Sequence, residues 1–238
     1  MSLKKTYKSF GRTAILIEWE AKVEDVILKD ITLFKQKLIH AISDNIVDVI
    51  IGYHTLVIKY NKDINSLVDE IQRLKSIYNS SVDSINTENF LWEIPVCYDA
   101  AFGVDLELIS ERNKLTIPEI IKLHTQQIYT VYFIGFLPGF LYLAGLNEKL
   151  CIPRKETPRL KVAKGSVAIG GQQTGIYPSE SAGGWSLIGK TPISFFEVKR
   201  ENPCFAKGGD KIKFISISMK DFLSLKENRV SIKRQPLL

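Results

Sequence analysis

The strongest constraint on the fold of this chain is the uneven distribution of its glycines. Ten of the fifteen glycines and four of the nine prolines lie between residues 135 and 189. Glycine adopts backbone conformations that other residues avoid, and proline stiffens the loops between them. This composition favours tight turns and short strands over long helices. With strands expected at 129–136, 166–170, 194–198 and 211–218, it predicts a β-barrel or sandwich.

The first 98 residues follow a different pattern. Apolar residues recur at helical spacing over 25–42 and 63–77, and strand-like runs cover 14–19, 47–51, 55–60 and 90–98. The order strand, helix, strand, strand, helix, strand is typical of the split βαβ, ferredoxin-like arrangement. Gly52-Tyr53-His54 predicts a hairpin turn, and Asp63 is expected to cap the second helix. A further helix, capped by Thr116, is expected over residues 117–127.

The composition is that of an ordinary globular protein, with 45% hydrophobic and 24% charged residues. No apolar run approaches the roughly 20 residues needed to cross a bilayer. The N-terminal lysines have no apolar stretch behind them, which argues against a signal peptide. We therefore expect a cytoplasmic protein without a membrane segment.

The three cysteines and three histidines are scattered along the chain. None of the spacings between them matches a zinc site, so the sequence predicts no metal site. We expect the thiols to be reduced core or loop residues. They are Cys97, Cys151 and Cys204, and the histidines are His40, His54 and His124.

The positive charge gathers in one segment. The net charge is +6, and residues 149–164 carry six Lys and Arg against Glu156 alone. A basic surface is typical of nucleic-acid binding, but this segment lacks interleaved aromatic residues and a recognisable nucleic-acid module. A small anionic ligand or an acidic partner chain fits a local basic loop better.

One stretch matches the phosphate-binding pattern G-x-x-x-x-G-K-[ST] over residues 184–191. Its interior, Trp-Ser-Leu-Ile, is bulky and apolar, and residues 192–198 indicate a strand where the motif requires a helix. We interpret the match as accidental. Lys190 stays a candidate for meeting a phosphate as a point charge.

His124 has two interpretations. At the end of the helix 117–127 it fits a hydrogen-bonded structural histidine. Its ordinary pKa lies near neutrality, so it also fits a proton-transfer group, and we retain it as the candidate catalytic residue. No serine lies in a nucleophile-elbow context, so a Ser-His-Asp hydrolase is not supported.

Several motifs follow one another in a set order along the chain. They are Val96-Cys97-Tyr98-Asp99, Phe102-Gly103-Val104-Asp105-Leu106, His124-Thr125 and the stretch 135–185. In this order they resemble a known family, which comprises the B subunit of 5-oxoprolinase, kinase A inhibitor and allophanate hydrolase subunit 1. The likeness covers nearly the whole chain, and it departs from the family where Ala182 replaces proline and Lys190 replaces arginine.

The resemblance implies an α+β chain with a ferredoxin-like domain over residues 1–90 and a cyclophilin-like β-barrel over residues 91–238. It also implies two partners, the C subunit of 5-oxoprolinase, which is a biotin-dependent carboxylase-like chain, and the A subunit. Such complexes convert 5-oxo-L-proline to L-glutamate with hydrolysis of ATP, a co-substrate whose site the C subunit would share. Alternatives are an inhibitor of a sporulation histidine kinase and a subunit of an allophanate hydrolase or urea carboxylase-type carboxyltransferase.

Candidate binding residues lie in the glycine-rich, basic stretch. Arg154 and Arg159 each follow a proline, and each can grip a carboxylate through two parallel hydrogen bonds. We expect Gln172 and Tyr177 to orient the ligand and Trp185 to form a wall. The alternative, that these residues only build the turns of a small barrel, stays open at this point.

Overall fold

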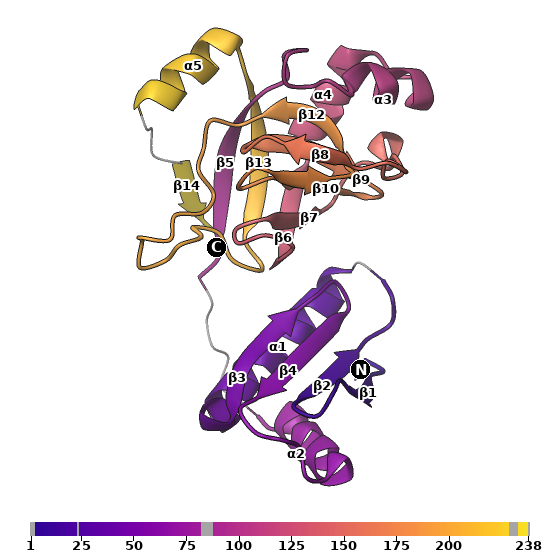
Figure 1. The fold of residues 1–238 in the computed structure, drawn as a ribbon, viewed down its shortest axis with the longest axis vertical. Helices are drawn as coiled ribbons and strands as arrows, with labels where there is room; N and C mark the ends of the chain where they lie inside the picture. Colours follow the sequence, from indigo (N-terminus) through magenta and orange to yellow (C-terminus); the bar gives the residue numbers. More distant parts are fainter. Residues whose placement is uncertain (1–2, 23, 82–87, 229–232, 238) are drawn as a thin grey trace. The chain divides into compact units, whose positions relative to one another are not determined.

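The computed structural model describes residues 3–22, 24–81, 88–228 and 233–237. The chain divides into two compact units, one within residues 1–87 and one within residues 88–238 (Figure 1). Each unit has its own hydrophobic core.

The first unit is a sheet of antiparallel neighbours with two helices. The sheet order is β1-β2-β4-β3. Apolar side chains of the helices share one core with Ile15, Ile17 and Ile58 of the sheet. The elements are β1 (Thr6–Ser9), β2 (Ala14–Glu18), α1 (Asp25–Ile42), the 3-10 turn η1 (Ser43–Asn45), β3 (Ile46–Ile51), β4 (Thr55–Tyr60) and α2 (Leu67–Asn79).

The split βαβ order is confirmed, but the strand at 90–98 does not belong to this sheet. The fourth position is taken by β1, which pairs with β2 over four residues. The chain instead carries β5 (Phe90–Cys97) into the second unit, where it pairs in parallel with a strand more than a hundred residues later. Ile94 and Val96 bury their side chains there, in the core of the barrel.

Two local expectations in this unit have different outcomes. The hairpin is confirmed, because β3 and β4 pair and the Gly52 N–H donates to the Thr55 carbonyl at 2.8 Å. The cap predicted at Asp63 is wrong, since Ser66 caps α2 by accepting from the Asp69 N–H at 3.3 Å. The Asp63 carboxylate forms an ion pair with Arg12 instead.

Within the described residues of the second unit, seven strands close a barrel in the order β12-β9-β10-β7-β6-β13-β5, and β12 returns to pair with β5. A strand expected at 194–198 is absent from the described structure, where this segment is irregular apart from one bridge between Phe196 and Cys204. The barrel strands are β5, β6 (Ile128–Ile134), β7 (Leu141–Ala144), β9 (Ser166–Gly170), β10 (Gln173–Ile176), β12 (Ser186–Lys190) and β13 (Lys211–Ile217).

The second unit also contains elements that are not strands of the barrel. A two-stranded ribbon of β8 (Arg159–Val162) and β11 (Ser181–Gly183) forms a sheet of its own. The cap expected at Thr116 is confirmed, and it forms a capping box with Glu119. The strand β14 (Lys233–Pro236) pairs with β5. The remaining elements of this unit are α3 (Leu106–Asn113), α4 (Ile117–Gln126), η2 (Glu148–Leu150) and α5 (Met219–Asn228).

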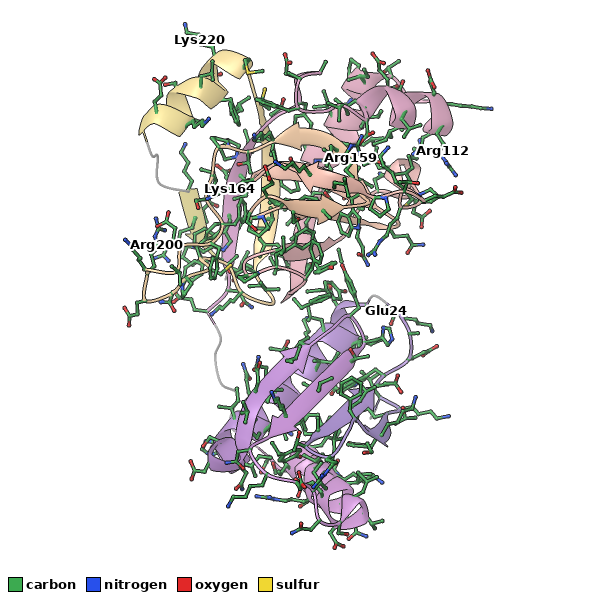
Figure 2. All side chains as sticks on the ribbon, viewed as in Figure 1. Glu24, Arg112, Arg159, Lys164, Arg200 and Lys220 are labelled. Atoms are coloured by element: carbon green, nitrogen blue, oxygen red, sulfur yellow. The ribbon has the colours of Figure 1, made fainter. Side chains whose placement is uncertain are left out.

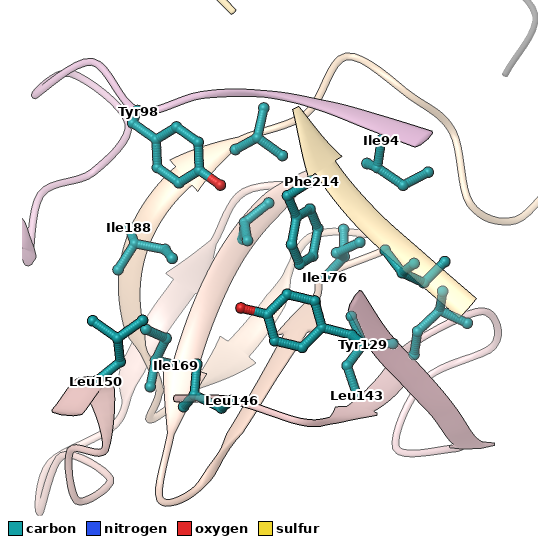
Figure 3. Packing of buried hydrophobic residues seen from close by; sticks show 14 of the residues in the cluster. Ile94, Tyr98, Tyr129, Leu143, Leu146, Leu150, Ile169, Ile176, Ile188 and Phe214 are labelled. Atoms are coloured by element: carbon teal, nitrogen blue, oxygen red, sulfur yellow. The ribbon is translucent and has the colours of Figure 1, made fainter. Parts of the chain in front are cut away.

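The barrel interior is filled by aliphatic and aromatic side chains. Figure 3 shows Tyr98, Tyr129 and Phe214 among the isoleucines and leucines of the surrounding strands. A core this full leaves no room for a ligand at its centre, so a binding site has to lie on the outside of the barrel. None of the described helices is both long and apolar enough to span a bilayer.

Candidate functional site

A cavity of about 300 Å³ opens on the outside of the barrel. Four segments meet there: the turn between β6 and β7, the loop before β8, the end of β10 and the chain from β11 to β12. Its walls are mostly aromatic, and its charged members are cations. The lining residues are Phe136, Phe140, Tyr142, Arg154, Lys155, Pro158, Tyr177, Ala182, Gly183, Gly184 and Trp185.

Edge-to-face ring contacts hold the cavity wall together. The Phe140 ring centroid lies 5.2 Å from that of Tyr177 and 5.6 Å from that of Trp185, with near-perpendicular planes. Glycines make room for these rings. A Cβ added at Gly170 would lie 2.5 Å from the Trp185 indole, and one at Gly183 would overlap the Tyr177 hydroxyl. The glycine-rich sequence therefore shapes the wall.

Phe136 stands at the mouth of the cavity in a strained conformation. Its φ is 65°, and the Leu137 N–H donates to the Gly135 carbonyl at 2.7 Å, which closes a three-residue turn. A bulky residue seldom adopts a positive φ. The side chain is nevertheless 61% exposed. Such an outlier marks a position where the surrounding structure imposes the conformation, as is common at binding sites.

Two cations line the cavity. The Arg154 guanidinium lies over the Trp185 ring, 5.6 Å from its centroid. Lys155 is the neighbouring cation, and its backbone N–H donates to the Gly184 carbonyl at 2.8 Å. Because Arg154 stacks on an aromatic wall, its charge faces the space that a ligand would fill. The structure thus brings three of the candidate binding residues, Arg154, Tyr177 and Trp185, to one cavity.

Arg159 occupies a different position from Arg154. Its Nη2 donates to the Asp105 carboxylate at 2.7 Å, and the Lys155 Nζ lies 2.9 Å from the same oxygen. Figure 2 shows Arg159 lying against the barrel strands, whereas Lys220 projects from α5. Arg159 does not line the cavity. The structure therefore assigns one arginine and one lysine to the cavity, where the sequence indicated two arginines.

Asp105 is a buried carboxylate that the sequence did not mark as a site residue. Burial by itself raises its pKa, but hydrogen bonds from Arg159, Lys155 and the Leu187 N–H outweigh this and lower the pKa below its usual value. The Leu187 N–H donates at 2.7 Å. Asp105 is thus ionised at neutral pH, at the base of the cationic loop.

Tyr177 keeps its phenol protonated at neutral pH. Burial raises its pKa, while a backbone hydrogen bond from Trp185 and the charges of Arg154 and Arg159 oppose that rise. A protonated phenol in the cavity wall can both donate and accept hydrogen bonds. This suits the orienting role expected of Tyr177.

His124 lies in the barrel core, away from the cavity. Its ring is fully buried, and Nε2 lies 3.0 Å from the Thr174 hydroxyl, which itself donates to the Ala168 carbonyl. Nε2 therefore carries the proton, and Nδ1 accepts from the Tyr98 hydroxyl at 2.8 Å. Burial lowers the pKa of the ring to about 3. These contacts favour the structural interpretation of His124.

Gln172 and Lys190 are not brought into the cavity. Gln172 is exposed on the turn between β9 and β10. Lys190 ends β12, with its Nζ 5.4 Å from the centroid of Phe102. The stretch 184–191 is largely the strand β12 itself, so it forms no phosphate loop, as expected. No three metal-binding side chains gather among the residues that the structure describes.

Comparison with known proteins identifies the family. The model of the family described as carboxyltransferase domain, subdomain C and D, matches residues 5–206, and the chain belongs to this family. It is 37% identical to the 5-oxoprolinase B subunit of Escherichia coli O157:H7 over 86% of this chain and 93% of that one. It is 47% identical to the 5-oxoprolinase B subunit of Bacillus subtilis (strain 168) over 57% of this chain, and spans 56% of that relative's length. The family resemblance drawn from the motifs is thus confirmed.

Two solved structures share the fold. One is the protein TTHA0988, 30% identical, with a TM-score of 0.73 over 86% of this chain and 40% of that one. The other is the urea carboxylase of Kluyveromyces lactis, 18% identical, with a TM-score of 0.84 over 99% of this chain and 24% of that one. In both, the matching region is a part of a much longer polypeptide.

The sequence contained signals for the residues that it did not single out. Asp105 lies in one of the family motifs, and Phe136, Phe140 and Tyr142 lie in the glycine-rich stretch. Lys155 was one of six basic residues without a distinguishing feature. Only the fold brings these residues together: four of them line one cavity, and Asp105 contacts Arg159, which lies 54 positions later in the chain.

Proposed function

We propose that this chain is the B subunit of an ATP-dependent 5-oxoprolinase. Together with the C and A subunits it would convert 5-oxo-L-proline to L-glutamate and hydrolyse ATP. The observation that carries the proposal is the pairing of Arg154 and Lys155 with aromatic walls in one small cavity, in a chain whose relatives bear this name.

The chemistry of 5-oxoproline fits such a cavity. The molecule is a five-membered lactam ring with one carboxylate. A volume of about 300 Å³ lies at the small end of ligand pockets, which suits a ligand of this size. Arg154 and Lys155 would bind the carboxylate, the rings of Phe140 and Trp185 would cover the apolar face of the lactam, and Tyr177 would bond its polar edge.

We assign ATP to the assembled enzyme rather than to this chain alone. Opening a ring amide is difficult, and phosphorylation of the amide oxygen would make its carbon a better electrophile. The stretch 184–191 does not form a phosphate-binding loop, since residues 186–190 form a strand. We therefore propose that the C subunit provides or shares the ATP site, and that this chain alone is inactive.

A partner chain also agrees with the longer relatives. The region that matches this chain makes up 40% of TTHA0988 and 24% of the urea carboxylase, so in those proteins the fold is joined to further polypeptide. The exposed Phe136 at the cavity mouth is a suitable contact for such a partner, because exposed aromatic residues are common anchors of interfaces.

The test is 5-oxoproline-dependent ATP hydrolysis by this chain alone, with the C subunit, and with both the C and the A subunits. We expect turnover only in the mixtures. Arg154→Ala should lower kcat/KM for 5-oxoproline by about tenfold or more, since a hydrogen bond to a charged group contributes about 1.5–3 kcal/mol. Arg112→Ala, at an exposed position on α3, is the matched control. No turnover in a fully assembled complex would contradict the proposal.

The family description suggests one alternative activity, a carboxyltransferase reaction. The fold likeness to urea carboxylase favours it only at the level of architecture. Biotin-dependent carboxylation by the same assembled complex, in place of 5-oxoproline-dependent ATP hydrolysis, would favour this alternative.

A further inference from the structure

The cationic side of the cavity is not built on the barrel sheet. Arg154 and Lys155 lie on the loop 153–158, which continues into the β8–β11 ribbon, and this ribbon is a separate two-stranded sheet. We call the loop and the ribbon, residues 153–162 and 181–183, the flap. A two-stranded ribbon has little stability by itself, so contacts with the barrel must determine its position.

Asp105 supplies a contact between the flap and the barrel from a buried position. Its side chain is 5% exposed, and it lies directly before α3. One carboxylate oxygen accepts a hydrogen bond from the Arg159 guanidinium at 2.7 Å and lies 2.9 Å from the Lys155 Nζ, and both cations belong to the flap. The other accepts the Leu187 N–H of β12 at 2.7 Å. One side chain therefore joins α3, a barrel strand and the flap.

The charges make this contact difficult to replace. The Nη1 of Arg159 is buried without a hydrogen-bond partner among the described residues, so this guanidinium depends on Asp105 for compensation of its charge. Loss of the carboxylate would leave the partly buried Arg159 cation uncompensated, which is unfavourable. The exposed ion pair between Lys161 of the flap and Glu180, the residue before β11, has an N–O distance of 3.3 Å, and exposed pairs of this kind contribute little.

We propose that Asp105 is a positioning residue: it fixes the flap against the barrel and so holds Arg154 and Lys155 where they bind the carboxylate of the ligand. The claim that Asp105 holds the flap depends on the geometry alone. The claim that the held cations bind the ligand rests on the proposed function. Asp105 itself does not line the cavity, so it acts through the two cations.

Limited trypsin digestion tests the fixing without any assay of activity. Trypsin cleaves after Lys155 and Arg159, whose side chains the Asp105 carboxylate holds. In Asp105→Asn we expect cleavage at these two sites to become about tenfold faster, because a neutral amide leaves the charge of both side chains uncompensated. Glu180→Gln, which removes one negative charge from the exposed pair with Lys161 of the flap, should leave the rate unchanged.

The cleavage rates of these variants decide whether Asp105 holds the flap. Equal cleavage of wild type and Asp105→Asn at these sites would overturn the proposal, and so would equal acceleration by Glu180→Gln. If Asp105→Asn does not fold, the double variant Asp105→Asn with Arg159→Gln removes one of the two unpaired charges together with the trypsin site at 159, and cleavage after Lys155 should still be faster than in the wild type. Asp105→Glu keeps the charge and should restore part of the protection.

Kinetics of the assembled complex test the link to the ligand. Asp105→Asn should raise KM for 5-oxoproline about tenfold and leave KM for ATP unchanged, since displaced cations weaken carboxylate binding. A merely structural role would lower kcat through loss of folded enzyme and leave both KM values unchanged. If the wild-type complex shows no 5-oxoproline-dependent turnover, the proposed function fails, while the digestion result still decides whether Asp105 fixes the flap.

Discussion

Burying a neutral histidine makes the stability of the second unit depend on pH. His124 is 0% exposed, and its two ring nitrogens contact the hydroxyls of Tyr98 and Thr174. Burial lowers its pKa to about 3. In the unfolded chain the same ring titrates near its ordinary pKa of about 6.5. Between these values the unfolded state binds a proton that the folded state does not.

The sign and size of the effect follow from this difference. The folded pKa is lower than the unfolded pKa, so the contribution of His124 is complete above about pH 6.5 and is lost as the pH falls towards about 3. Each pKa unit corresponds to about 1.36 kcal/mol. Lowering the pH from about 8 to about 5 should therefore reduce the free energy of unfolding by about 2 kcal/mol through this residue.

Urea unfolding of wild type and His124→Gln measures the effect. Glutamine has a hydrogen-bonding amide but does not titrate in this range. In a Trp19→Phe background the fluorescence comes from Trp92 and Trp185, both in the second unit. The difference in unfolding free energy between the two proteins should shrink by about 2 kcal/mol between about pH 8 and about pH 5.

The control is His40→Gln, because His40 is exposed on α1 of the first unit. It should leave the pH dependence of the second unit unchanged. Identical pH dependence in wild type and His124→Gln would refute the reasoning, since His124 would then titrate alike in both states. The same variant also tests catalysis: retention of kcat in the assembled complex would favour the structural role of His124.

Two further changes test the cavity wall. Gly170→Ala should destabilise the second unit by about 1–3 kcal/mol in urea unfolding, because its Cβ would lie 2.5 Å from the Trp185 indole; Gly184→Ala, whose nearest contact would be 3.5 Å, is the matched control. Phe136→Gly should raise stability by up to about 1 kcal/mol by relieving the positive φ, yet lower 5-oxoproline turnover. Unchanged turnover would contradict a role for Phe136 at the cavity mouth.

Elements with strong local signals were predictable from the sequence. The apolar face of α1, the β3–β4 hairpin and the capping box of α4 each depend on residues close together in the chain. Strand pairing is not local. The polar β1 carries no apolar signal as an edge strand, and nothing near residue 90 indicates that β5 pairs with β13. The short helices α3 and α5 have too few buried residues for a clear period.

The candidate site, like the strand pairing, depends on contacts between distant residues that the sequence does not reveal. Pro153-Arg154 and Pro158-Arg159 look equivalent in the sequence, and a spacing of five residues cannot distinguish them. The structure does, because only Arg159 meets a buried carboxylate, which comes from a distant part of the chain. Arg159 is turned to Asp105 and does not line the cavity, so Arg154 is the arginine left to bind an anion, with Lys155 beside it in the cavity wall.

The glycines connect the fold to the site in an indirect way. A glycine-rich, basic stretch suggests close approach of the backbone to a phosphate, yet Gly170, Gly175 and Gly183 approach aromatic rings instead. At Gly175 an added Cβ would come within 3.0 Å of both Phe140 and Trp185. The missing side chains let the rings pack edge to face, and the packed rings leave an apolar wall beneath Arg154. A cation above an apolar wall suits the proposed ligand, which combines a carboxylate with a compact apolar body, and this fit depends on where the rings lie rather than on the count of glycines.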